Sequence, residues 1–363
     1  MIDFRYHVVS IVAVFLALAI GIVLGSTELQ GTTIDVLRNT SQQIKNQYDA
    51  THARNVELNQ QVTADQAVAQ AGEARLLDGL LTGQRVVVVN APGASGSVGT
   101  GVTKALRDAG ATVAGQVNLQ PKLLDASQNN QQFLTQLVQQ LAAPGAVPSN
   151  GTALQQAAKL LGSAILTKST DPNGSTTGGS PGTSARTILE GYAQAGLLSI
   201  SGQPSVPATL AVVITPSSAP DGGVSDPANQ GLITLAQQLD TVGLGTVVAG
   251  SAGGSGSGSA IDALRGSAAA GQISTVDYAD TVTGQIVTVW ALAEALAGHK
   301  AASYGPQSAD SAAAPSPAPT PATPPTSPPS TRPHGKNGKN GKTATAGKNS
   351  AASPAAKPSR SGS

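Results

Sequence analysis

The sequence predicts an α/β protein with four parts: a single N-terminal transmembrane helix, a coiled-coil stalk, a doubly wound and largely parallel α/β domain, and a disordered C-terminal tail. Three observations predict this class. An uncharged apolar run opens the chain, short β-branched runs then alternate with helical spacing, and the composition finally becomes rich in Ala, Pro, Ser and Thr. These shifts place the four parts at residues 1–25, 26–82, 83–305 and 306–363.

The apolar run from Val8 to Gly25 predicts a membrane anchor. Its eighteen residues span about 27 Å as a helix, close to the hydrocarbon thickness of a bilayer and longer than the apolar region of most secretory signals. A cleaved signal is the alternative, since the residues from Val23 to Gly25 are small enough for cleavage. Arg5 precedes the run and no basic residue follows it until Arg38. The positive-inside rule therefore predicts a single-pass plasma-membrane protein with a cytoplasmic N-terminus and an extracytoplasmic bulk.

Small residues inside this run form one helical stripe. They recur every four residues, at Ala13, Ala17, Gly21 and Gly25. Small side chains at this spacing let two helix backbones approach closely in lipid, where packing replaces the hydrophobic effect. The stripe therefore predicts helix–helix pairing, although Gly and Ala are also common in transmembrane helices that do not pair.

A heptad pattern follows between residues 34 and 76 and predicts the coiled-coil stalk. With Ile34 at position a, eight of the thirteen a and d positions are apolar, and Asn55 at an a position is typical of a register-fixing residue. The pattern predicts a homodimer or a coiled-coil hetero-partner; a monomeric stalk folded back on the globular domain is the alternative. The residues expected to carry this pairing, together with the small stripe, are Leu37, Ile44, Leu58 and Val62.

Short strands alternate with helices between residues 83 and 305. Strands are predicted at 85–89, 112–119, 197–200, 209–215, 245–250 and 273–278. Helices are predicted after the first strand as far as Gly110, and at 230–242, 260–270 and 282–297. Residues 128–166 are predicted to be helical with a loop at 144–151, and a surface loop is predicted at 169–184. Because the first strand is continuously apolar, it suits a parallel sheet covered on both faces. The pattern predicts one doubly wound domain with a helical insertion between its second and third strands.

Ligands of such a sheet bind at the carboxyl ends of its strands. Loops 90–99, 216–229 and 251–259 lie at this edge, but none has the G-x-G-x-x-G spacing or the lysine of a phosphate-binding loop. Asn229 and Asp277 are the candidate residues for a ligand there. Asp226, which precedes Pro227 and Ala228 at a helix start, is expected to cap that helix instead. Since these loops contain no histidine and the chain has no Cys, we expect no enzyme activity and no cofactor.

The charge balance, the scarcity of Cys and Met, and the low aromatic content limit the kinds of ligand and partner that the chain is expected to bind. Residues 1–305 carry 14 Lys and Arg against 19 Asp and Glu, whereas residues 306–363 carry seven basic residues against Asp310 alone. The chain has no Cys and its one Met is Met1, so we expect no disulfide and no metal site. Aromatic residues make up only 2% of the chain, so we expect no stacking surface for single strands and no nucleic-acid partner.

The segment after Pro306 contains too few apolar residues to bury a core, and it is therefore predicted to be disordered. Its lysines and arginines predict a contact with anionic cell-wall polymers or lipid head groups, since basic residues are attracted to anionic membrane surfaces. A solvated spacer is the alternative interpretation of the same composition.

Several short motifs occur in an order that resembles a known family. They are AVFLALAIGIVLGS at residues 13–26, Asn229-Gln-Gly231, GTVVAG at residues 245–250, STVD at residues 274–277 and the closing Tyr304-Gly305. In this order the chain is similar to the actinobacterial copper transport protein family of MctB-like proteins, over roughly residues 5–305. The resemblance implies a non-enzymatic membrane protein with a role in copper efflux or homeostasis at the cell envelope. The family name also implies a location in an outer membrane.

The residues favour an alternative within the same resemblance. Cu(I) sites use Cys and Met sulfur, and this chain has only the sulfur of Met1. One helix does not form a pore by itself. Related corynebacterial proteins of the SteB type are implied to act as coiled-coil scaffolds that bind a membrane partner and regulate peptidoglycan hydrolysis during division. Copper homeostasis and an envelope scaffold are therefore the two hypotheses.

Overall fold

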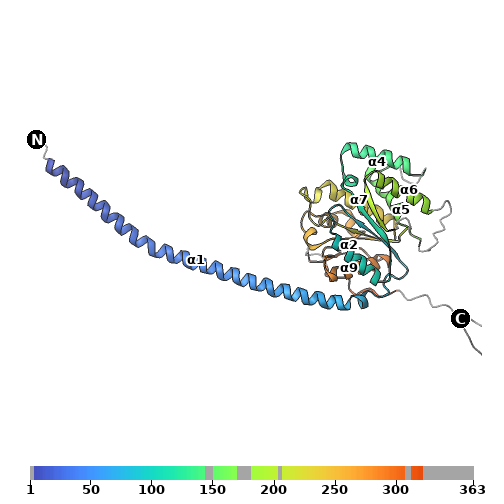
Figure 1. Cartoon of the computed structure of the whole chain (residues 1–363), viewed down its shortest axis with the longest axis horizontal. Coiled ribbons are helices and arrows are strands. Elements are labelled where there is room, and N and C mark those ends of the chain that lie inside the picture. Colours follow the sequence, from blue (N-terminus) through green and yellow to red (C-terminus); the bar gives the residue numbers. More distant parts are fainter. Residues whose placement is uncertain (1–3, 144–149, 170–180, 203–206, 307–311, 322–363) are drawn as a thin grey trace, which may run out of the picture. The chain divides into compact units, whose positions relative to one another are not determined.

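The α/β class predicted from the sequence is confirmed. The computed structural model describes residues 4–143, 150–169, 181–202, 207–306 and 312–321, with the backbone alone at 26–35 and 181–184. Among these residues, seven strands form one sheet in the order β3-β2-β1-β4-β5-β6-β7. Helices cover the sheet (Figure 1). The predicted disorder of residues 322–363 lies outside the described residues.

The sheet is parallel except at one edge, where β2 and β3 run antiparallel. Every residue of β4 and β5 is buried, as are the four central valines of β1, which explains their continuous apolar sequences. All six predicted strands are present, and β7 is an addition. The strands are Arg85–Asn90 (β1), Thr112–Leu119 (β2), Leu198–Gly202 (β3), Leu210–Ile214 (β4), Gly245–Ala249 (β5), Ser274–Val276 (β6) and Ser303–Tyr304 (β7).

The helical insertion between β2 and β3 is also confirmed, and it consists of four separate helices, α3 to α6. The last of them begins at Pro181, within the segment 169–184 that the sequence predicted to be a loop. The helices of the domain are Gly96–Asp108 (α2), Pro121–Leu124 (α3), Gln128–Leu141 (α4), Ala153–Ile165 (α5), Pro181–Gln194 (α6), Pro227–Val242 (α7), Ala260–Arg265 (α8) and Val282–Leu296 (α9). The predicted helix at 260–270 is shorter in the structure, since α8 ends at Arg265. Gly266 and Ser267 interrupt it, and a separate 3₁₀ turn follows at Ala268–Gly271.

Two hydrophobic cores lie on opposite faces of the sheet, because successive strand residues point to opposite sides. Val87 and Val89 of β1 contribute to the core that packs against α4, α5, α6, α7 and α8. Val86 and Val88 contribute to the core that packs against α2 and α9. The sheet is therefore covered on both faces, as its apolar strands require.

A single helix, α1 (Phe4–Leu77), contains both the predicted anchor and most of the predicted stalk. No proline interrupts these 74 residues, so the backbone hydrogen bonds continue across the boundary expected at residues 25 and 26. The segment Phe4–Gly25 is long and apolar enough to cross a membrane, and none of it is buried within the protein. A membrane anchor and the start of the stalk are thus parts of one helix.

The last turns of α1 are joined to the α/β domain. Leu77 is fully buried in the core beside α2 and α9, and Glu73 is 3% exposed. Lys104 of α2 donates to Glu73 at 2.6 Å and to Asp108 at 2.6 Å. Both hydrogen bonds raise the pKa of Lys104, and the bond to Asp108 has the larger effect. Trp290 Nε1 of α9 donates to the carbonyl of Leu76 at 3.2 Å, and so satisfies a backbone oxygen at the helix end.

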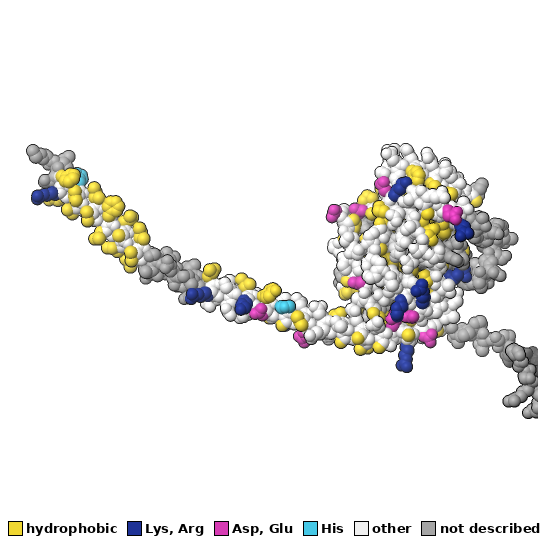
Figure 2. Space-filling model, in the orientation of Figure 1, with side chains coloured by type: hydrophobic (Ala, Val, Ile, Leu, Met, Phe, Trp, Pro, Cys, Tyr) yellow, Lys and Arg dark blue, Asp and Glu magenta, His cyan; other side chains and the backbone are white. Residues whose placement is uncertain are grey.

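The four seam residues expected to carry pairing are exposed along α1: Leu37 by 67%, Ile44 by 61%, Leu58 by 55% and Val62 by 51%. Hydrophobic side chains lie along this helix in Figure 2. A Cβ atom added at Gly21 or Gly25 would contact nothing within 4 Å. Ala69, also a seam position, packs instead against the core of the α/β domain. Pairing stays a prediction, and the seam available to a partner ends before Ala69.

The chain segment 312–321, placed within the disordered tail by the sequence, contacts the domain. Ala312 donates to the Ser303 carbonyl at 3.0 Å and accepts from Gly305 at 2.8 Å. The Tyr278 hydroxyl donates to the Ala313 carbonyl, and Pro315 is buried. The amino-acid composition of this segment did not indicate these hydrogen bonds, because the segment forms them through its backbone N–H and carbonyl groups.

We predict that Leu77→Ala lowers the free energy of unfolding by about 2–5 kcal/mol, since it removes a fully buried side chain from the core. The neighbouring Leu76→Ala is the matched control, because Leu76 is 46% exposed, and it should cost far less. Urea unfolding of the full chain in detergent, followed by fluorescence of the sole tryptophan, Trp290, measures both. Equal losses in the two variants would contradict this junction.

Candidate functional site

The strands that follow β1 in the chain are added to the sheet first on one side of β1 and then on the other, so the strand order reverses beside β1. From β1 the chain passes through α2 to β2 on one side, whereas β4, on the other side of β1, leads into α7. Because α2 and α7 lie on opposite faces, the loops that follow β1 and β4 diverge at the carboxyl edge. Such a switch point is where open α/β sheets bind ligands.

Hydrogen bonds tie the loops together at this point. The backbone N–H and the hydroxyl of Ser217 both donate to the Gly93 carbonyl, at 3.0 Å and 2.7 Å. Gly254, in the loop after β5, lies very close to the loop after β4: a Cβ added to it would be 2.3 Å from the Pro216 carbonyl oxygen. A glycine is therefore required there for close backbone approach, and the three predicted edge loops form one connected wall.

Asn229 holds the next part of this wall. It lies in the first turn of α7 and is 2% exposed, and its Nδ2 donates to the Gly223 carbonyl at 2.8 Å and to the Gly258 carbonyl at 3.0 Å. The preceding Asp226 caps α7 by accepting from the Ala228 N–H at 2.8 Å. The capping role expected from Asp-Pro at a helix start is present, and Asn229 links two loops.

A cavity of about 610 Å³ opens between these loops and α3. Asp125, Asp226 and Asn229 line it, beside prolines and leucines, and no Lys, Arg or His is among its lining residues. Gly231 lets α3 approach α7, since an added Cβ would lie 3.2 Å from Leu124. Hydrogen bonds from the Ser127 N–H and hydroxyl lower the pKa of Asp125.

A smaller cavity of about 350 Å³ adjoins it and shares Pro92, Gly93 and Pro121. Its polar side chains are neutral: Asn90 Nδ2 of β1 donates to Asn118 Oδ1 of β2 at 2.7 Å. An acidic residue at the end of the second strand would suit the ribose of a dinucleotide, and Asn118 stands there instead. This arrangement agrees with the absence of a nucleotide motif in the sequence.

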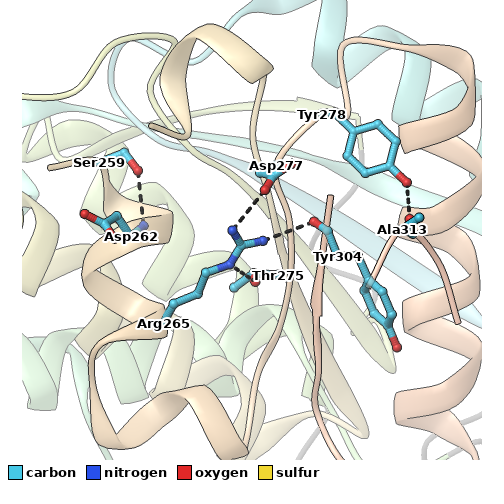
Figure 3. Close-up of polar contacts among 8 residues, drawn as sticks. All are labelled: Ser259, Asp262, Arg265, Thr275, Asp277, Tyr278, Tyr304 and Ala313. Atoms are coloured by element: carbon cyan, nitrogen blue, oxygen red, sulfur yellow. Dashed lines mark hydrogen bonds and ion pairs between the residues drawn. The ribbon is translucent and has the colours of Figure 1, made fainter. Parts of the chain in front are cut away.

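Asp277 lies elsewhere, inside the domain. It is fully buried, and Arg265 of α8 donates to its Oδ2 at 2.9 Å. The same guanidinium donates to Thr275 Oγ1 at 2.9 Å and to the Tyr304 carbonyl at 3.0 Å, so it joins α8, β6 and β7 (Figure 3). Asp277 does not line the cavity that Asn229 lines. The structure does not bring the two candidate residues together, and a ligand role for each stays a prediction.

Sequence reasoning missed Asp125, which reaches the cavity from the helical insertion. The local signal was present: Asp125-Ala-Ser127 directly follows a short helix started by Pro121, a pattern typical of an Asx turn. What the sequence concealed was that α3 packs beside α7. No group of three or more His, Cys, Asp or Glu arranged to hold a metal ion occurs in the part of the chain that the structure describes.

Comparison with known proteins decides the family. The family model described as "Copper transport outer membrane protein, MctB" matches residues 1–315. The chain belongs to this family. The copper transporter MctB of Mycobacterium tuberculosis (strain ATCC 25618 / H37Rv) is 30% identical over 312 residues, which cover 84% of this chain and 96% of the relative. That of Mycobacterium leprae (strain TN) is 31% identical over 318 residues, with the same coverage of both chains.

The resemblance drawn from the sequence motifs is thus confirmed for the MctB family. The matched residues include the apolar helix Phe4–Gly25, which indicates membrane anchoring, and all of the described domain as far as Pro315. Residues 316–363, with most of the basic tail, lie beyond the match.

We predict that Arg265→Met lowers the free energy of unfolding by about 3–5 kcal/mol, because the Asp277 carboxylate then stays buried without its arginine. Arg186→Met is the matched control. The Arg186–Glu190 pair is exposed, at 74% and 62%, and its loss should change the stability by at most about 0.5 kcal/mol. Urea denaturation of both variants measures the difference. An Arg265 variant as stable as the control would show that the pair does not hold α8 to the sheet.

Proposed function

We propose that this chain is a membrane-anchored, non-enzymatic protein of copper homeostasis at the cell envelope. The single observation that carries the proposal is the match of the MctB family model to residues 1–315. The curated relatives, whose names describe copper transporters, are matched along 96% of their length. A shared function is more strongly supported by such full-length similarity than by a shared domain.

The residues support a role without a copper site of the chain's own. Cu(I) prefers thiolate and thioether ligands, and the chain has no Cys and a single Met at position 1. In this proposal copper is the cargo of another protein, and this chain acts through contacts with that partner. The described loops at the carboxyl edge, 90–99, 216–229 and 251–259, contain no His and no Cys that could form a nucleophile–base pair, which supports a non-catalytic role.

The proposed location is the plasma membrane, with the N-terminus in the cytoplasm and the α/β domain outside. One apolar helix, Phe4–Gly25, preceded by Arg5 and followed by no basic residue until Arg38, supports this orientation. The family description places its members in an outer membrane. A helical anchor of this length is sufficient for attachment to a bilayer in either case.

A second candidate function is a coiled-coil scaffold that binds a membrane partner and regulates peptidoglycan hydrolysis. The exposed seam of α1 favours it, because Leu37, Ile44 and Leu58 are each more than half exposed. Apolar side chains at heptad spacing are stabilised by burial against a second helix. The partner is a second copy of this chain or another helix.

Deletion of the gene in its native host tests both candidates. We expect the deletion strain to accumulate copper and to lose copper tolerance, and the full chain to restore both. The seam variant Leu37→Ser/Ile44→Ser/Leu58→Ser should fail to restore them if a helical partner is needed. The control Val36→Ser/Val56→Ser/Val68→Ser removes three exposed apolar side chains outside the a and d positions and should restore them.

Unchanged copper tolerance and copper content in the deletion strain would overturn the copper proposal. If septation and lysozyme resistance fail in the same strain, the scaffold function is supported instead. Normal division together with lost copper tolerance would overturn the scaffold.

A further inference from the structure

We infer that the cavity of about 610 Å³ beside Asp125, Asp226 and Asn229 binds a small organic cation, an apolar body that carries an ammonium or guanidinium group. The inference concerns this cavity alone, called the acceptor cavity below, and does not depend on the copper function. Its volume lies within the range of small-molecule sites, and its place at the switch point is where α/β sheets bind ligands.

Asn229 supplies a fixed hydrogen-bond acceptor. Asn229 lines the acceptor cavity and is only 2% exposed. Two carbonyls, of Gly223 and Gly258, accept from its Nδ2, so the amide orientation is set. Its Oδ1 receives no hydrogen bond from the described residues. Because Asn229 lines the cavity, this oxygen is available to accept a hydrogen bond from a donor that enters it.

Asp125 and Asp226 give the acceptor cavity negative charge. Asp226 Oδ1 accepts from the Ala228 N–H at 2.8 Å, and Asp125 accepts twice from Ser127, at 2.8 Å and 2.9 Å. Each carboxylate has about four acceptor positions, so both can accept further donors. The bonds from Ser127 lower the pKa of Asp125, and this carboxyl is therefore ionised at neutral pH.

No cationic side chain balances these carboxylates inside the acceptor cavity, because its lining includes no Lys, Arg or His. Lys122, near in sequence, is engaged elsewhere: its Nζ donates to the Ala195 carbonyl at 3.0 Å and lies 4.1 Å from the centre of the Phe133 ring. An anion such as a nucleotide would be repelled here. A cation with N–H donors complements all three acceptors.

The remaining walls are apolar and rigid. Proline has no N–H donor and a fixed φ, so proline walls are preorganised and offer no competing hydrogen bonds. They suit an apolar ligand body whose burial contributes binding energy. The apolar lining residues that carry this argument are Pro92, Pro121, Leu124, Pro216, Pro220 and Leu232.

Three ligands with the same ring and different charge test the inference: cyclohexylmethylamine, cyclohexylmethanol and cyclohexanecarboxylate. Each is titrated calorimetrically into the full chain held in phosphatidylcholine nanodiscs, and titrations of empty nanodiscs are subtracted. We expect the amine to bind about tenfold more tightly than the alcohol, and the carboxylate to bind more weakly still. Equal affinity for the amine and the alcohol, stronger binding of the carboxylate, or no saturable binding of the amine would overturn the inference.

Charge-removing variants locate the site. Asp125→Asn and Asp226→Asn each keep an acceptor for the turn or the helix cap, so the fold should be retained, which thermal unfolding checks. Each should weaken amine binding by about tenfold and leave alcohol binding unchanged. Asp221→Asn is the control, since Asp221 is exposed in the same loop as Asp226 but does not line the cavity. Equal effects of all three substitutions would overturn the assignment.

Discussion

The parallel pairing of β1 between β2 and β4 is the constraint on which the rest of the α/β domain depends. Since parallel strands end at the same edge, this pairing gathers the loops that follow them, and the reversal of winding sends α2 and α7 to opposite faces. Bonds from Ser217 to Gly93, and from Asn229 to Gly223 and Gly258, tie these loops together as the walls of a preformed cavity.

The second constraint is the continuity of α1. One helix runs from the apolar segment at Phe4 to the buried Leu77, where Trp290 donates to the Leu76 carbonyl and Lys104 pairs with Glu73. Burial of Leu77 therefore fixes the end of the stalk to the domain that carries the cavity. The seam on the N-terminal side of this junction stays exposed, and none of its residues lines the cavity.

Most of the fold followed from the sequence, and the details of the site did not. Apolar strands and glycine-bounded helices have local signals, so the sheet, the insertion and the cap at Asp226 were predicted. Asp125 was missed because only the packing of α3 on α7 brings it to the edge. Asp277 lies at a strand end as expected, but its pairing with Arg265 and the backbone of Tyr304 depends on contacts that no spacing reveals. Backbone contacts likewise concealed the docking of residues 312–321.

Hydrogen exchange of the Ser217 amide tests the preformed cavity most directly. This N–H donates to the Gly93 carbonyl at 3.0 Å across the switch point. If the loops are tied as described, the amide should exchange at least about 100-fold more slowly than its intrinsic rate in the full chain without ligand. Exchange at the intrinsic rate would show that the loops open freely, and it would contradict a cavity that exists before its ligand binds.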